Sequence, residues 1–150
     1  MSEGKRPGGL TALAVFNFVF SGLGLIGLPG MLANYAGWLP TNRVTERYRP
    51  ALEALQNLPL HVFASIFLLS LLSYVFLLLS GIGYLQQKKV LGRILGSIYA
   101  ILGIINTTVT AVTFPTDVYG GIHIMTMIDL IYPVLTLILL NTTFKEDLTN

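Results

Sequence analysis

Four long apolar stretches, separated by short polar segments, dominate the hydrophobic pattern of the chain. They lie at about residues 9–36, 60–85, 90–114 and 119–140. Each approaches the roughly twenty residues that an α-helix needs to cross the hydrocarbon core of a bilayer. The pattern therefore predicts an all-α protein, a four-transmembrane-helix bundle that forms a single membrane domain over residues 1–150.

The first stretch follows Lys5 and Arg6, which is also the position of a signal peptide. A secretory signal has an apolar core of only about 7–15 residues. The run from Leu10 to Leu32 carries no charge, and Asn17 is its one strongly polar side chain. We therefore expect a span that is retained. Four glycines within it indicate close helix contact or kinking: Gly22, Gly24, Gly27 and Gly30.

Basic residues set the expected orientation, because short cytoplasmic loops collect lysine and arginine. Six of them fall on one side of the predicted bundle and three on the other. The first side holds Lys5, Arg6, Lys88, Lys89, Arg93 and Lys145, and the second holds Arg43, Arg47 and Arg49. We therefore expect both termini on the cytoplasmic side of a cell membrane.

Two segments lie outside the predicted spans. Residues 37–59 form an outer loop in which apolar residues recur at helical spacing between charges, which predicts one or two short amphipathic helices on the membrane surface. Trp38 and Tyr35 are the expected interfacial anchors. The polar surface of this loop includes Arg47, Arg49 and Glu53. The tail, residues 141–150, is polar and is expected to fray.

Asp129 is the one acidic residue inside a predicted span, and it lies near the middle of the fourth. A charged side chain there costs about 2.5–3.5 kcal/mol on insertion scales and normally faces the bundle interior. Counting back through a short turn at residues 115–117 places it level with about Ile104 to Asn106, so we expect a hydrogen bond to the third or second helix. The candidate proton or cation site consists of Asp129, Asn106, Thr110, Ser73 and Tyr74, with Thr107 and Ser70 at similar depth. The favoured interpretation of Asp129 itself is a protonated, hydrogen-bonded aspartic acid that only joins helices.

A stripe of small residues begins at the basic start of the third stretch: Gly92, Gly96, Ala100 and Gly103. Small side chains let helices approach closely. Whether the neighbouring helix belongs to this chain or to another is left open. Because the connection to the fourth stretch is short, we expect a tight antiparallel hairpin whose contact face includes Gly96, Ala100 and Gly103.

Two histidines, His61 and His123, are expected near the outer boundary of the membrane. Paired histidines can bind metal or sense pH. No acidic or cysteine ligand accompanies them at metal-like spacing, so two independent interfacial histidines are favoured. We expect no metal site and no cofactor.

Composition limits the classes of function. The chain is 53% hydrophobic and 11% charged, against roughly a quarter charged in soluble domains. It has no cysteine, which excludes disulfides, thiolate metal sites and thiol redox chemistry. The net charge of +2 comes from small clusters beside apolar segments, a pattern suited to lipid headgroups and not to nucleic acid. No GxSxG, HExxH or Walker lysine occurs, so nothing indicates catalysis.

The stretch Gly81–Leu102, GIGYLQQKKVLGRILGSIYAIL, resembles a pattern of small bacterial four-span integral membrane proteins of unknown function. In those proteins a G-x-G-x-L helix end meets a lysine turn, then a Gly/Ala-Arg step and a Y-A-I-L helix. Leu91 stands where they usually carry an aromatic residue. Residues 131–141 look like their last span. The resemblance implies four spans in a bacterial inner membrane and no particular activity.

Residues 49–57, RPALEALQN, are similar to the start of the second helix in membrane-bound glutathione-binding enzymes. In that family the segment is cytosolic and continuous with the helix. Here Pro50 and Pro59 interrupt it and the charge pattern places it outside.

The sequence favours a non-catalytic structural or accessory subunit that packs against itself, as a homo-oligomer, or against another membrane protein. One alternative is a small transporter or channel component that uses Asp129 as a proton or cation site. Another is an enzyme acting on a membrane-embedded lipid, with the charged outer loop as its entry surface.

Overall fold

The computed structural model describes residues 8–38, 40, 46, 49–114 and 122–148, with the backbone alone for 122–126 and 128. Its elements in chain order are α1 (Gly8–Tyr35), α2 (Arg49–Gln56), α3 (Leu60–Leu85), the π-helical turn η2 (Lys89–Ile94), α4 (Leu95–Thr113) and α5 (Ile122–Asn141). The expected all-α class is confirmed over these ranges.

Three helical segments are long and apolar enough to cross a membrane: Gly8–Tyr35, Leu60–Leu85 and Lys89–Thr113. The last long helix, α5, has 20 residues, and its segment Asp129–Asn141, where all side chains are described, is apolar. Many large apolar side chains on these helices are exposed, for example Ile26 at 77% and Val112 at 81%. Such surfaces suit contact with lipid.

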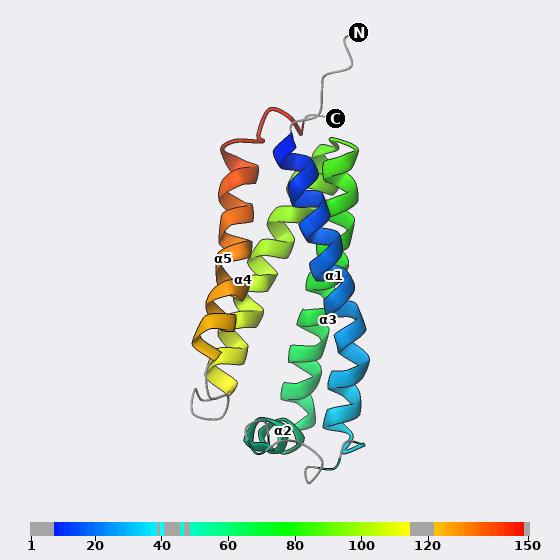
Figure 1. The fold of residues 1–150 in the computed structure, drawn as a ribbon, viewed down its shortest axis with the longest axis vertical. Helices are drawn as coiled ribbons and strands as arrows, with labels where there is room; N and C mark the ends of the chain where they lie inside the picture. Colours follow the sequence, from blue (N-terminus) through cyan, green and yellow to red (C-terminus); the bar gives the residue numbers. More distant parts are fainter. Residues whose placement is uncertain (1–7, 39, 41–45, 47–48, 115–121, 149–150) are drawn as a thin grey trace.

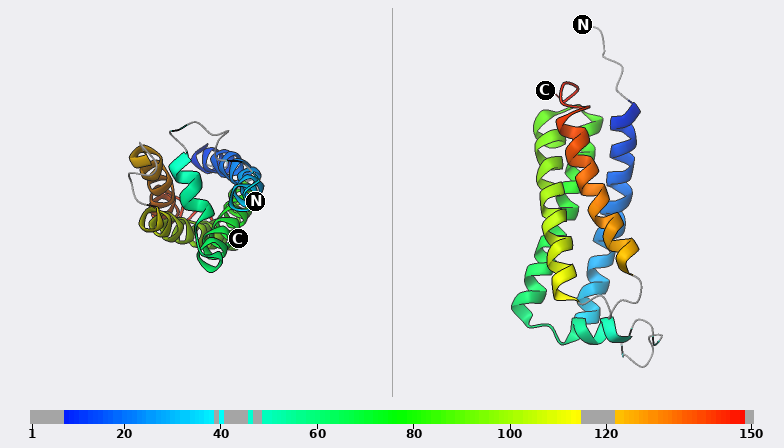
Figure 2. Two further views of the ribbon diagram at one scale, coloured as in Figure 1. Left: turned by 90° about the horizontal axis from the view of Figure 1, so that it is seen from below. Right: turned by 90° about the vertical axis from the view of Figure 1, so that its left-hand side faces the viewer.

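The long helices pack in chain order, with α1 against α3, α3 against α4, and α4 against α5. The start of α1 and the ends of α3 and α5 lie together at one end of the bundle, which we call the closed end (Figure 1). Toward the opposite end, the α4–α5 pair diverges from the α1–α3 pair. There α2 lies across the bundle, as the view along its axis shows (Figure 2).

Two of the long helices end in a left-handed residue. Gly37 has φ 75°, and the backbone amide of Trp38 donates to the carbonyl of Ala33 at 3.0 Å. This is the Schellman arrangement, which satisfies carbonyls left free at a helix end. Helix α3 ends in the same way at Gln87, with φ 54°, a conformation that costs a residue with a Cβ about 1–2 kcal/mol.

The third predicted span begins as the π-helical turn η2 and not as regular α-helix. The turn lies where the backbones of α3 and η2 touch: a Cβ on Gly83 would overlap the backbone of Leu91 and Gly92. Gly92 is buried. The hydrophobic pattern could not predict this π-turn, because the turn accompanies a contact between two segments, and the pattern carries no information about such contacts.

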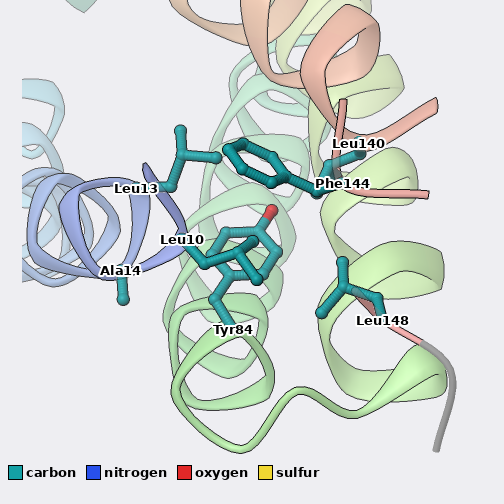
Figure 3. Packing of buried hydrophobic residues seen from close by; sticks show 7 residues of the cluster. All are labelled: Leu10, Leu13, Ala14, Tyr84, Leu140, Phe144 and Leu148. Atoms are coloured by element: carbon teal, nitrogen blue, oxygen red, sulfur yellow. The ribbon is translucent and has the colours of Figure 1, made fainter. Parts of the chain in front are cut away.

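A cluster of buried side chains fills the closed end (Figure 3): Leu10, Leu13, Ala14, Tyr84, Leu140, Phe144 and Leu148. The expectation that the tail frays is wrong for residues 142–148. Phe144 and Leu148 are only 7% and 1% exposed. Gly9 and Gly92 leave room for them, because a Cβ at either position would contact their side chains. Two apolar residues in a polar tail are enough to dock it when such space exists.

The opposite end is held by polar contacts between α2 and α1. The amide of Gln56 donates to the carbonyl of Asn34 at 3.0 Å, and the Tyr35 hydroxyl donates to the carbonyl of Leu58 at 3.1 Å. The Tyr35 ring also stacks on Phe63, with centroids 3.7 Å apart. Tyr35 therefore joins two helices within the fold, in addition to any role as an interfacial anchor.

A buried polar link joins α1, α3 and α5. Asn17 is fully buried, and its amide donates to the Ser80 hydroxyl at 2.8 Å. The Tyr132 hydroxyl donates to the carbonyl oxygen of the same amide. One side chain on α1 thus connects to two other helices. The sequence marks Asn17 as an isolated polar residue in an apolar run but names no partner for it.

Candidate functional site: an interhelical cavity at Asp129

A cavity of about 380 Å³ lies among α1, α3, α4 and α5, and every one of these helices contributes to its wall. Its lining residues are Phe20, Leu23, Gly24, Ser73, Tyr74, Leu77, Tyr99, Gly103, Asn106, Thr107, Asp129, Tyr132 and Pro133. The cavity is open and not sealed, because Phe20 is 38% exposed and Asp129 is exposed as well.

Among the described residues of this wall, Asp129 is the only one that carries a carboxylate. No hydrogen bond or ion pair joins it to any side chain within the described ranges, so the expected bond to α3 or α4 is not found there. Asn106, the nearest expected partner, instead donates from its amide to the Ser70 hydroxyl at 3.1 Å. The carboxylate is thus available to whatever enters the cavity.

Ser73 lines the same cavity and has an unusual lack of hydrogen bonding. It is 4% exposed, and its buried hydroxyl has no partner among the residues that the structure describes. Other serines of α3 donate to a carbonyl of their own helix, Ser65 at 2.8 Å and Ser80 at 2.9 Å. A buried polar atom without a partner costs free energy, so the Ser73 hydroxyl is a ready contact for a bound molecule.

Aromatic rings form much of the remaining wall. Phe20 and Tyr132 meet edge to face with centroids 5.0 Å apart, and Tyr99 follows Tyr132 at 6.3 Å. We call Phe20, Tyr132 and Tyr99, from α1, α5 and α4, the aromatic wall. Tyr74 of α3 lies against Gly24, where a Cβ would overlap its ring.

Among the glycines of α1 singled out from the sequence, Gly24 is therefore the one at a close helix contact. A Cβ would meet nothing within 4 Å at Gly22, Gly27 or Gly30.

The cavity brings together most of the residues that the sequence nominated. Asp129, Asn106, Ser73 and Tyr74 all line it, and Thr107 does so as well. Thr110 does not, because it lies about one turn further along α4 than Asn106. The sequence missed the aromatic wall, since an aromatic residue in an apolar span carries no signal of which way it faces.

The small-residue stripe packs within this chain. Its members are Gly92, Gly96, Ala100 and Gly103. A Cβ on Gly96 would overlap the Tyr84 hydroxyl of α3 and lie 2.7 Å from Leu140 of α5, and a Cβ on Gly103 would lie 3.1 Å from Pro133 of α5. Ala100 is fully buried. The stripe thus allows close contact with both α3 and α5.

The outer-loop residues that the sequence singled out near α2 do not form a common site among the residues described. Arg49 lies 3.8 Å from Glu46, Glu53 is exposed, and Trp38 is 79% exposed. Arg47 lies outside the described residues.

Of the two histidines, His61 is exposed at the start of α3, and the side chain of His123 lies outside the described ones. Among the side chains that the structure does describe, no group of three histidine, cysteine, aspartate or glutamate residues could hold a metal ion.

Comparison of the chain with protein-family models, with curated proteins and with solved structures finds no match.

Proposed function

We propose that the chain is a four-span integral membrane protein with both termini in the cytoplasm, and that it binds a cation or a proton at Asp129 as a small transporter or channel component. The observation that carries this proposal is the cavity itself. It places one carboxylate, without a described partner, in an open space bounded by four helices.

The surroundings of Asp129 support binding over a purely structural role. A carboxylate that only joined helices would be expected to hydrogen bond to its neighbours, yet Asn106 bonds to Ser70. Intramembrane carboxylates are costly, and in bundles they commonly mark ion or proton paths. The unpartnered Ser73 hydroxyl in the same wall adds a second polar group for a ligand.

The function is tested by replacing Asp129 with asparagine in proteoliposomes and measuring cation- and pH-driven flux. The matched control is Asp147→Asn, which removes the same charge in the tail after α5. We expect flux to be lost only in Asp129→Asn. Equal flux in both variants, or none in the parent protein, would refute the transport role.

The span count and orientation are tested by cysteine labelling, which the absence of native cysteine makes direct. A membrane-impermeant thiol reagent on intact cells should label Trp38→Cys but neither Lys88→Cys nor Glu146→Cys. Permeabilised cells should show labelling at all three positions. If intact cells label both Trp38→Cys and Glu146→Cys but not Lys88→Cys, then α5 does not cross the membrane.

The second candidate function is an accessory subunit of a larger membrane complex. The exposure of Asp129 at the surface of this single chain favours it, because another chain could cover the open side of the cavity. Native mass measurement after extraction separates the two: a monomer that binds cations favours the transporter, and a stable complex with a second protein favours the subunit.

A further inference from the structure

We infer that the ligand of the Asp129 cavity is an organic ammonium cation, held by the carboxylate and the aromatic rings of Phe20, Tyr99 and Tyr132. This inference rests on the proposed function and narrows it to one class of cation.

The described residues of the cavity carry too little negative charge for a divalent metal ion. Ca²⁺ takes six to eight oxygen ligands, and Mg²⁺ requires a near-ideal octahedron. Among the described residues of the wall, Asp129 alone carries a negative charge; the other polar groups are hydroxyls and the Asn106 amide, which is already bonded to Ser70. The charge of a divalent cation in this site would therefore be only partly compensated.

The aromatic rings supply what an organic cation needs instead. The face of an aromatic ring is negative, so it attracts an alkylammonium group within about 6 Å of its centre. The three rings of the aromatic wall follow one another at 5.0 and 6.3 Å, so one cation can contact more than one of them. Their apolar surface also tolerates the alkyl groups, which a bare ion lacks.

The volume of the cavity and its buried Ser73 hydroxyl also fit a small organic cation. Its volume is about 380 Å³, whereas one water molecule needs only about 10–15 Å³ of such space. The cavity volume lies near the lower end of the roughly 300–1,000 Å³ found for small-molecule pockets. The buried Ser73 hydroxyl has no described partner, so a ligand that carries its own hydroxyl gains a hydrogen bond there.

The experiment measures binding to the full chain in detergent by calorimetry with three probes: choline, its neutral isostere 3,3-dimethylbutan-1-ol, and potassium chloride. We expect choline to bind at least tenfold more tightly than the isostere. Asp129→Asn should reduce this preference to the smaller part that the aromatic rings supply. Tyr99→Leu should weaken choline binding about three- to thirtyfold, whereas Tyr99→Phe, which keeps the ring, should leave it unchanged.

Because Tyr99 is buried, Tyr99→Leu also removes packing contacts, so the folding of each variant is checked by its melting temperature. Phe20→Leu is the second test, since Phe20 is 38% exposed and its replacement perturbs packing less. It should also weaken choline binding about threefold or more.

The outcomes separate this inference from the function on which it rests. Potassium binding that depends on Asp129, without choline binding, overturns the organic cation and leaves the cation site standing. Absence of binding by either cation overturns the organic cation, and the pH-driven flux of the parent protein and of Asp129→Asn then decides whether the proposed function stands as a proton site. Equal affinity for choline and its isostere, or equal choline binding by Phe20→Leu, Tyr99→Leu and the parent protein, overturns the role of the carboxylate or of the rings.

Discussion

Asn17 should be the most sensitive polar residue of α1, and Asn17→Ala tests how the bundle is joined. Its amide bonds to Ser80 at 2.8 Å and to the Tyr132 hydroxyl. Hydrogen bonds between membrane helices contribute about 0.6 kcal/mol on average and at most about 1.7 kcal/mol. Loss of both bonds, together with the space left by the side chain, should lower the free energy of unfolding by about 1–3 kcal/mol.

Ser21→Ala is the matched control. Ser21 lies one turn further along the same helix and is also fully buried, but its hydroxyl donates only to the carbonyl of Phe18 in its own helix, at 3.2 Å. That bond persists when the helices separate without unwinding. It is therefore present in both the folded and the unfolded state and contributes little to the free energy of unfolding. The expected change is within about 0.5 kcal/mol.

The assay is a titration of micelles with dodecyl sulfate, followed by near-ultraviolet circular dichroism. A double-mutant cycle with Tyr132→Phe isolates the bond between Asn17 and Tyr132, and its coupling energy should be about 0.6–1.7 kcal/mol. The reasoning fails if the two changes add within about 0.3 kcal/mol, or if Ser21→Ala destabilises as much as Asn17→Ala.

Four further substitutions can be measured in the same unfolding assay. Gln87→Gly should stabilise by about 1 kcal/mol, because glycine adopts the left-handed backbone at this helix end without strain; a loss of stability would contradict the cap. Gly83→Ala should destabilise by about 2 kcal/mol or more, since its Cβ meets backbone, whereas Gly27→Ala has open space and should be neutral or stabilising. Tyr35→Phe removes a hydrogen bond to Leu58 and should cost about 0.5–1.5 kcal/mol, and no change would show that ring stacking alone holds this contact.

The long helices were predictable because lipid imposes one strong pattern, a run of apolar residues with charge at its ends. Helix α1 begins and ends within one residue of the predicted 9–36, and α3 has the predicted bounds. The docked tail and the π-turn were not predictable. Both depend on space left by glycines on other segments, Gly9, Gly83 and Gly92, and sequence gives no distance between segments.

For the residues of the cavity, the level along the bundle could be predicted from the sequence, but the direction in which each side chain points could not. Counting residues from a turn gives the level of a side chain in a bundle, and it placed Asn106 and Asp129 in one cavity. It gives no rotation about the helix axis. Rotation decides that Asn106 bonds to Ser70 and not to Asp129, and that Tyr99 and Tyr132 face the cavity.

The helices of the bundle are packed together at the closed end and diverge toward the opposite end. Side chains from α1, α3 and α5 and from the tail pack there, while the helix pairs part toward α2. Helix α5 has 20 residues and is therefore about 30 Å long. A rotation of about 5° around its packed end moves its far end by roughly 2.6 Å over that length. A small change of angle at the closed end therefore corresponds to a larger displacement at the opposite end of the bundle, where the Gln56 amide joins α2 to α1.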